Sequence, residues 1–256
     1  MDTLLQEHDD ALIEYPDCDG NPMSDNTLQF HWIVLIKENL ETQFADDPNV
    51  FIAGDLLWYP VKGQPKVRAA PDAMAIFGRP KGYRGSYMQW VEGGIAPKAV
   101  FEILSPNNSR EEMDRKFDFY EKHGVDEYYL FDPETNDLHG WTRRGGRLEK
   151  IANMNGWISP ALGIRFELDA NGLTIFHPDG TPFTSHLEEA REKHQVKQDL
   201  AIAEYERKRA EEQRSQAEQE RKRAEAEAAA AVKLAAEQAA EIARLREQLK
   251  LQQPKT

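Results

Sequence analysis

The chain has 256 residues and a net charge of −13, from 45 acidic against 32 basic side chains. No apolar run approaches the roughly 18 residues of a membrane-spanning helix, and the acidic start from Met1 to Asp10 lacks the basic-then-apolar pattern of a secretory signal. Without such an apolar run we expect no membrane partner. The single cysteine, Cys18, excludes an internal disulfide and a cysteine-based zinc site, so we expect a reducing, cytoplasmic setting.

The first part of the chain predicts an α/β fold. Residues 25–45 predict a helix whose apolar stripe consists of Leu28, Trp32, Leu35, Ile36 and Leu40. Two apolar runs then predict strands, at residues 49–59 and 67–77. The glycine-rich segment 78–96 predicts a loop with one helical turn near residues 86–92.

The alternation of strands and helices continues after this loop. Residues 98–104 form a short apolar run that predicts a central strand. Ser109 and Glu112 form a capping box that opens a helix, and Gly124 marks its end. A further buried strand is predicted at residues 127–131. Antiparallel hairpins are predicted within residues 136–176, around the turns at Arg144-Gly145-Gly146 and Asn171-Gly172.

The composition changes after Ser185, where Ala, Glu, Gln, Lys and Arg predict one long helix. From residue 187 to residue 252 such a helix would be about 100 Å long. Its best apolar seam consists of Ile242, Leu245 and Leu249, preceded by Gln238 and by alanines at seam positions. Two interpretations remain open: a solvated, charged helix that frays, and a parallel self-associating coiled coil that nucleates near its C-terminus.

The negative charge is confined to the first part of the chain. Residues 1–186 contain 30 acidic and 17 basic side chains, whereas residues 187–256 contain 15 of each. An acidic body binds polyanions weakly, because phosphate contacts depend on Lys and Arg. Binding of nucleic acid would therefore need a local basic patch or a bound divalent metal.

Two carboxylates interrupt apolar segments that predict strands. Asp72 follows Pro71, and Glu102 lies within the run Ala99–Leu104. An ionised carboxylate in an apolar strand is costly unless it is paired or binds a metal. We expect the two groups to lie together at one edge of the sheet, where a divalent cation would satisfy both. Taken alone, an aspartate after proline such as Asp72 is more often a turn or strand-end residue.

Lys116 is the third candidate, on the helix that Ser109 opens. It lies beside the buried stripe formed by Met113, Phe117 and Tyr120, so its stem could run inward and bring its ammonium to Glu102. There it would stabilise developing negative charge or orient an attacking water. The alternative is a lysine that merely extends its charge to solvent. Neither a phosphate-binding GxxxxGK[ST] motif nor a GxSxG motif occurs.

The segment from Ala70 to Pro133 resembles a restriction-endonuclease family with the PD-(D/E)XK nuclease fold. Members combine a Pro-Asp strand, a Glu-x-Leu-Ser-Pro strand, a helix bearing Lys and Tyr, and a Gly-Val-x-Glu-Tyr-Tyr strand. This sequence matches these features in order, at Pro71-Asp72, Glu102–Pro106, the helix with Lys116, and Gly124–Tyr129. The resemblance covers roughly residues 25–180.

The resemblance implies a restriction-endonuclease-like mixed central sheet flanked by helices, followed here by the long C-terminal helix as a coiled coil. It implies three parts: a partly ordered N-terminal extension at 1–24, a nuclease-like domain at 25–185 and a charged helical tail at 186–256. A site for Mg²⁺ (or Mn²⁺) is expected, with Asp72, Glu102 and the backbone carbonyl of Ile103 as ligands. Leu104 occupies the place of the motif's lysine, and in this family that role is thought to pass to the helix lysine, which matches Lys116.

These observations lead to the hypothesis of a metal-dependent endonuclease acting on phosphodiester bonds, in DNA, with Asp72, Glu102 and Lys116 as catalytic residues. An alternative is a catalytically inactive protein that keeps the nuclease fold and acts as a scaffold through its coiled-coil tail. A third is a metal hydrolase for a small phosphorylated substrate, which would tolerate the acidic body better. The tail is expected to make the protein a homo-oligomer.

Overall fold

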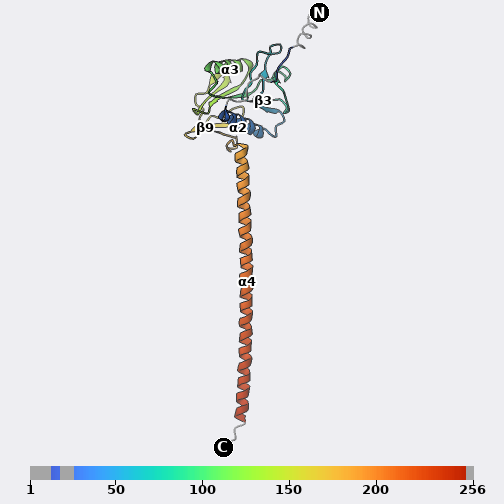
Figure 1. The fold of residues 1–256 in the computed structure, drawn as a ribbon, viewed down its shortest axis with the longest axis vertical. Coiled ribbons are helices and arrows are strands. Elements are labelled where there is room, and N and C mark those ends of the chain that lie inside the picture. The colour runs from blue at the N-terminus through green and yellow to red at the C-terminus, as the bar shows by residue number, and fades with distance from the viewer. Residues whose placement is uncertain (1–12, 18–25, 252–256) are drawn as a thin grey trace. The chain divides into compact units, whose positions relative to one another are not determined.

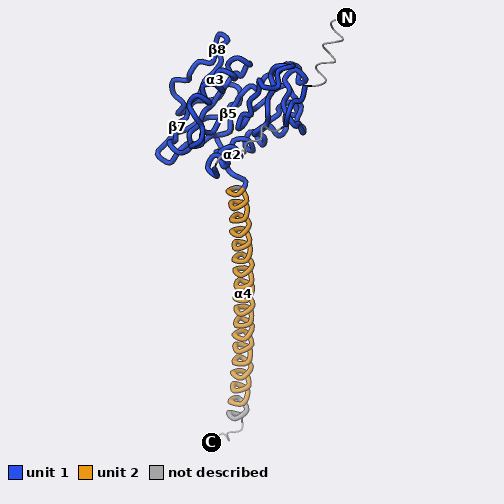
Figure 2. Tube along the Cα trace, turned by 45° about the horizontal axis from the view of Figure 1, so that its top comes forward, with its two compact units in different colours: residues 1–186 blue, residues 187–256 orange. Residues whose placement is uncertain are grey.

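The computed structural model describes residues 13–17 and 26–251, and the chain divides into two compact units, residues 1–186 and residues 187–256 (Figure 2). Most of the predicted extension at 1–24, including Cys18, lies outside the described residues. The first unit contains a mixed six-stranded sheet with helices, and a single long helix follows it (Figure 1). The predicted fold class is confirmed.

The main sheet has the strand order β1-β3-β5-β6-β7-β8. Its strands are β1 (Val50–Ala53), β3 (Ala73–Phe77), β5 (Ala99–Ile103), β6 (Glu127–Asp132), β7 (Asp137–Arg144) and β8 (Arg147–Lys150). β5 and β6 run parallel and the other neighbouring pairs run antiparallel. The parallel pair needs a crossover connection, which α3 (Arg110–His123) supplies. In this strand order β5, which contains Glu102, lies near the centre of the sheet.

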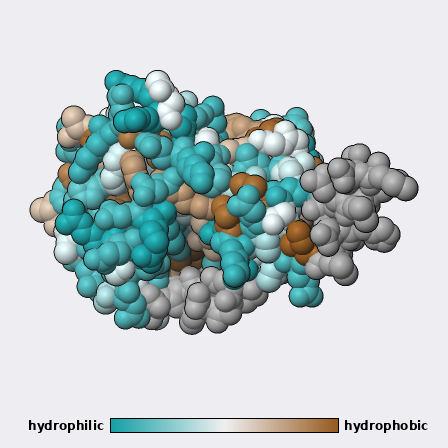
Figure 3. All heavy atoms as spheres, turned by 90° about the horizontal axis from the view of Figure 1, so that it is seen from above, coloured by the Kyte–Doolittle hydropathy of each residue, from teal (hydrophilic) through white to brown (hydrophobic). Residues whose placement is uncertain are grey.

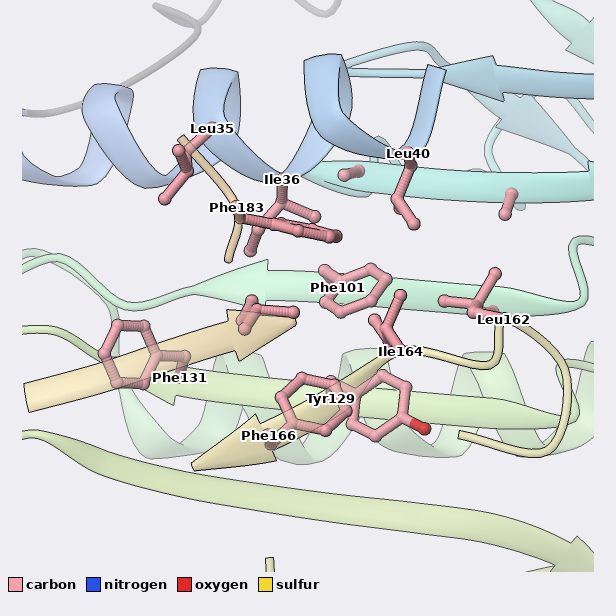
Figure 4. Packing of buried hydrophobic residues seen from close by; sticks show 14 of the residues in the cluster. Leu35, Ile36, Leu40, Phe101, Tyr129, Phe131, Leu162, Ile164, Phe166 and Phe183 are labelled. Carbon is pink, nitrogen blue, oxygen red and sulfur yellow. The ribbon is translucent and has the colours of Figure 1, made fainter. Parts of the chain in front are cut away.

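Each face of the sheet has its own hydrophobic core. α2 (Thr27–Gln43) packs on one face, where Figure 4 shows Leu35, Ile36 and Leu40 directed toward the sheet that contains Phe101 of β5. The residues of α3 pack on the other face, which includes Val100 of β5. Because side chains alternate along a strand, Glu102 projects to the same face as Val100, toward α3.

One position of the predicted α2 stripe was wrong. Leu28 is 41% exposed, and the neighbouring Gln29 is buried in its place. Gln29 lies one helical turn before Ile33, on the buried face of the helix, and its side-chain amide donates a hydrogen bond to the carbonyl of Ile103 at 2.9 Å. The hydrogen bond compensates for burying the amide.

Two predicted strands are shorter than expected. The run 49–59 breaks after β1, because the backbone at Asp55 turns into the left-handed region with φ of 47°. It resumes as β2 (Trp58–Tyr59), which pairs with β4 (Tyr87–Met88) in a separate small sheet. The run 67–77 is a strand only from Ala73, because Pro71 lacks the N–H that a central strand needs. β4 also replaces the start of the helical turn predicted near 86–92; hydrogen-bonded turns follow it.

The predicted helix ends and hairpins are confirmed. The Ser109 side chain accepts a hydrogen bond from the N–H of Glu112, and Gly124 ends α3 with a left-handed φ of 95°. β7 and β8 form one hairpin. β9 (Arg165–Asp169) and β10 (Gly172–Phe176) form the other and pack their apolar face on the core beneath α2.

α4 (His186–Leu251) is one continuous helix of 66 residues. Every side chain of α4 whose exposure is described is exposed, including the large apolar residues. Among the described helices, none has the length and apolarity required to cross a membrane. The face of the molecule shown in Figure 3 is mostly hydrophilic, and its apolar residues occur in small separate patches.

Candidate active site

Asp72 lies immediately before β3 and is 8% exposed. Its Oδ2 accepts a hydrogen bond from the N–H of Ile103 at 2.6 Å, which brings the carboxylate to the end of β5 beside Glu102. Burial raises the pKa of Asp72 well above its usual value, and the charge of Glu102 raises it further. The Lys116 ammonium and the Ile103 N–H oppose this rise without cancelling it.

Glu102 is 2% exposed, within an otherwise apolar strand. Its Oε2 lies 2.8 Å from Nζ of Lys116, and its Oε1 accepts a hydrogen bond from the hydroxyl of Tyr120. Both donors come from α3, four residues apart and therefore on one side of the helix. The strand retains a carboxylate because a cation and a hydroxyl compensate for its lost hydration.

Lys116 reaches Glu102, as its place beside the buried stripe predicts. Its side chain is 22% exposed, so most of the stem is buried. Burial lowers the pKa of Lys116, but the charges of Glu102 and Asp72 raise it more, and the net shift is upward. The side chain is therefore a cation at neutral pH, aimed at two carboxylates.

The carbonyl of Ile103 has a partner from the opposite face of the sheet. Gln29 of α2 donates to it at 2.9 Å, while Lys116 and Tyr120 of α3 reach Glu102 on the other side. Sequence reasoning missed the roles of Gln29 and Tyr120. Each gives a signal: Gln29 is a polar residue in a buried helical stripe, and Tyr120 carries a hydroxyl that needs a partner when buried.

Aromatic side chains line the α3 side of this cluster. The ring of Trp58 stacks on that of Tyr120 with centroids 6.3 Å apart, and Tyr128 packs against Tyr120 at 5.2 Å. The Tyr128 hydroxyl is buried and has no hydrogen-bond partner within the described part of the chain. Burial raises its pKa, and the charges of Glu102 and Asp72 add to the rise. The carboxylates thus adjoin an apolar wall, where electrostatic interactions are strong.

The oxygen atoms at the end of β5 suit Mg²⁺ or Mn²⁺ in kind. Among residues 13–17 and 26–251, no cluster of three or more His, Cys, Asp or Glu side chains could hold a metal. The donors here would be two carboxylates and one carbonyl, and Mg²⁺ often needs only one or two carboxylates because it keeps several waters. Asp72 and Glu102 share a single ammonium, and the charge of Asp55 also raises the pKa of Asp72. A divalent cation would neutralise this excess of negative charge.

A second buried glutamate lies on the neighbouring strand β6. Glu127 is 2% exposed, and its donors are all neutral. Its Oε2 accepts from the hydroxyls of Tyr129, at 2.9 Å, and Ser159, and its Oε1 accepts from the N–H of Ala161 at 2.9 Å. Glu127 therefore fastens the loop that contains Ser159 and Ala161 to the sheet.

Comparisons with known proteins decide the family. The model of a family described as "Uma2: Putative restriction endonuclease" matches residues 2–175. The chain belongs to the Uma2 family. One solved structure similar to this Uma2 chain is titled "Crystal structure of a putative nuclease belonging to DUF820 from Anabaena variabilis ATCC 29413". It has 15% identity and a TM-score of 0.41, and the alignment covers 56% of this chain and 78% of that chain. The comparison with curated proteins found no match.

Proposed function

We propose that this Uma2 chain is a Mg²⁺-dependent (or Mn²⁺-dependent) endonuclease that hydrolyses phosphodiester bonds in DNA. The observation that carries the proposal is the buried cluster of Asp72, Glu102 and Lys116 at the end of β5. Two acids and a lysine, held together from three separate elements, match the requirements of metal-assisted phosphodiester hydrolysis. Membership of a family described as "Putative restriction endonuclease" supports the same chemistry.

The side chains divide into ligands and groups that position them. Asp72, Glu102 and the carbonyl of Ile103 would hold the metal. When bound, Mg²⁺ lowers the pKa of a coordinated water and acts as a Lewis acid that polarises a phosphoryl oxygen. Gln29 and Tyr120 hold the Ile103 carbonyl and the Glu102 carboxylate in place.

Lys116 supplies the positive charge of the site. Its ammonium, held 2.8 Å from Oε2 of Glu102, would stabilise the negative charge that grows on the phosphate during hydrolysis. The residue two positions after Glu102 is Leu104, so β5 itself provides no lysine there. The ammonium arrives from α3 instead.

The charge distribution allows a polyanionic substrate despite the net charge of −13. Residues 61–84 contain six basic side chains and a single acid, Asp72 itself. This segment includes β3 and the first half of the glycine-rich loop, so positive charge is concentrated in the sequence around a candidate ligand. Arg79 and Arg84 of this segment pair with Glu92 at 2.6 Å each. The remaining Lys and Arg of the segment support contacts with the phosphate backbone of nucleic acid.

The alternative function is a scaffold that keeps the nuclease fold, lacks catalysis and acts through α4. Leu104 at the motif's lysine position and the acidic body favour it. The two functions differ in one measurable property. An endonuclease converts DNA to product, whereas a scaffold does not.

The test is nicking of supercoiled plasmid by purified full-length protein, with Mg²⁺ or Mn²⁺ and with a chelator. We expect metal-dependent nicking by the wild type and none by Glu102→Gln. Glu127→Gln is the matched control, because it makes the same change at an equally buried glutamate of the next strand. A folded wild type that never nicks DNA would favour the scaffold. Nicking by Glu102→Gln at the wild-type rate would contradict the proposed site.

We also propose that α4 makes the protein a homo-oligomer. Ile242 and Leu245 are 50% and 49% exposed on a helix whose described side chains are all exposed. The side chain of Leu249, the third residue of the predicted seam, lies outside the described residues. Sedimentation of the full-length protein should show a dimer or higher species, and Ile242→Glu with Leu245→Glu should shift it to the monomer. A monomeric wild type would contradict this proposal.

A further inference from the structure

The apolar seam of α4 extends further than its C-terminal end. Counting back from Leu245 and Ile242 in alternate steps of three and four residues places Val196 and Leu200 on the same seam, near the start of the helix. These four side chains are all exposed; Val196 and Leu200 are 60% exposed each. The seam thus has large apolar residues at both ends.

Between these ends, the seam alternates between bulky charged and small residues. One of its two repeating positions holds Arg207, Arg214 and Arg221, seven residues apart. The other repeating position holds alanine, at Ala203, Ala210, Ala217, Ala224 and Ala231. The pattern distinguishes the possible partners of α4, because parallel and antiparallel helix pairs bring different seam positions together.

A parallel, in-register pair suits this pattern poorly. Such a pair brings each seam residue against its own copy, so three layers, separated by alanine layers, would place Arg against Arg. The alanine layers between them would need closely spaced helices, while the arginine layers would push the helices apart. Sliding one helix by one or two heptads would still place Arg against Arg, and a shift of three heptads leaves long unpaired ends in a pair that does not close.

We propose that two copies of α4 pair antiparallel, with Leu200 of one helix packed against Leu245 of the other. In this register Arg214 lies opposite Ala231, and Arg221 lies opposite Ala224. Arg207 lies opposite Gln238 and Ala203 opposite Ile242. No layer places Arg against Arg. The layers in the middle of the seam then pair a large residue with a small one or two small residues, which suits one close helix spacing along the seam. The inference rests on the self-association of α4 proposed above.

The arginines keep their charges solvated in this arrangement. Glutamates lie beside the seam next to them, and Nε of Arg221 lies 3.3 Å from Oε1 of Glu225, one turn further along. The aliphatic stem of each arginine can cover the alanine opposite while its guanidinium reaches such a carboxylate. These glutamates flank the seam in both orientations, so they offset the positive charge without selecting one.

The antiparallel register separates the N-terminal ends of the two helices by roughly 110 Å, at 1.5 Å per residue. Each of these ends continues directly into a first unit. The two first units of one dimer would therefore be joined to opposite ends of the helix pair.

The test is the distance between spin labels in full-length protein, measured by pulsed electron paramagnetic resonance. Cys18→Ser removes the native thiol, and Lys208→Cys places one label per chain on α4, one residue beyond the seam position of Arg207. The antiparallel register aligns residue 208 with residue 237 of the other helix, which predicts roughly 45–50 Å between labels. A parallel pair predicts roughly 20–25 Å.

Lys222→Cys is the matched control, at the same heptad position near the centre of the seam. Its labels should lie within roughly 20–25 Å in either orientation, because residue 222 aligns with residue 223 in the antiparallel register. A long distance at 208 with a short distance at 222 supports the inference. Short distances in both variants would overturn it in favour of a parallel coil. Absence of coupling in both would overturn the self-association of α4 itself, whatever the nuclease assay shows.

Discussion

Glu102 and Glu127 lie on adjacent parallel strands, are 2% exposed each, and differ in what surrounds them. Glu127 accepts hydrogen bonds from two hydroxyls and a main-chain N–H, all neutral. Glu102 is paired with the ammonium of Lys116 and lies close enough to Asp72 to raise the pKa of that acid. One carboxylate is satisfied within the fold, while the other belongs to a cluster with unbalanced charge.

The difference shows that burial alone does not identify a functional carboxylate. Neutral donors form hydrogen bonds with both carboxylate oxygens of Glu127, so this side chain has a structural role and anchors the loop at Ser159 to the sheet. A second acid beside Glu102 would be unfavourable for stability alone, because two nearby carboxylates repel each other. Such a cluster is expected where a cation is to be bound. The following predictions test this contrast.

The largest contrast should appear in catalysis. Glu102→Gln removes a proposed metal ligand and should lower metal-dependent DNA cleavage by roughly 100-fold or more, the scale of losing a key electrostatic group. Glu127→Gln should keep most of the activity at a temperature where it is folded. Initial nicking rates for both variants, with circular dichroism to verify folding, check this. Equal losses in the two variants would remove the distinction between the carboxylates.

Lys116→Ala should lower turnover by more than tenfold, about 1.4 kcal/mol of transition-state stabilisation. The site would lose the only ammonium that pairs with Glu102 within the described residues. Lys122→Ala is the control, because Lys122 lies on the same helix and is exposed. Single-turnover rates at saturating metal report the effect. An unchanged rate in Lys116→Ala would leave the lysine as a structural partner of Glu102.

In the free energy of unfolding, we expect Glu127→Gln to lose more than Glu102→Gln, the reverse of their order in catalysis. Glu127→Gln replaces an acceptor oxygen with an amide donor facing hydroxyls and an N–H, and should cost about 1–3 kcal/mol of unfolding free energy. Glu102→Gln should cost less without metal, because it also removes the repulsion with Asp72. Urea denaturation in the presence of chelator measures both. A larger loss for Glu102→Gln would mean that the Lys116 pair outweighs the repulsion.

A further prediction concerns pH. The pKa of Asp72 is raised in the folded state, so the folded protein holds this proton more tightly than the unfolded chain. Without metal, Asp72 therefore lowers stability as pH rises from about 3.8 through its folded pKa, by about 1.4 kcal/mol per unit of pKa shift. Asp72→Asn should lose this dependence, so its stability relative to the wild type should increase between pH 4 and neutral pH, checked by urea denaturation. Parallel pH profiles for the two proteins would contradict the pKa shift.

Sequence patterns with a local cause predicted the fold well. The N-cap hydrogen bond to Ser109, the stop at Gly124 and both hairpin turns act over a few residues, and each is present. The break after Ala53 was missed, because it depends on the backbone at Asp55 and on pairing with the distant residues Tyr87 and Met88.

The candidate site could be predicted only in part for the same reason. Acids in apolar runs indicated Asp72 and Glu102, and helical spacing indicated Lys116. Tyr120 was predicted only as part of a buried stripe, and Gln29 lay outside the predicted stripe, which held Leu28 instead. A helical stripe shows roughly which face is buried but not which polar atom lies opposite. Glu127 shows the converse problem: its apolar strand resembles that of Glu102, and only the fold reveals its neutral donors.

The most direct measurement is anomalous scattering from a crystal of the full-length protein soaked in Mn²⁺. The proposed site predicts a peak at the end of β5, within about 2.0–2.3 Å of a carboxylate oxygen of Asp72 and one of Glu102, a typical oxygen–metal distance. Glu102→Gln crystals under the same conditions should lose the peak, and Glu127→Gln crystals should keep it. A wild-type crystal in which the Mn²⁺ peak lies elsewhere, or in which no peak lies beside the carboxylates of Asp72 and Glu102, would contradict the proposed metal site.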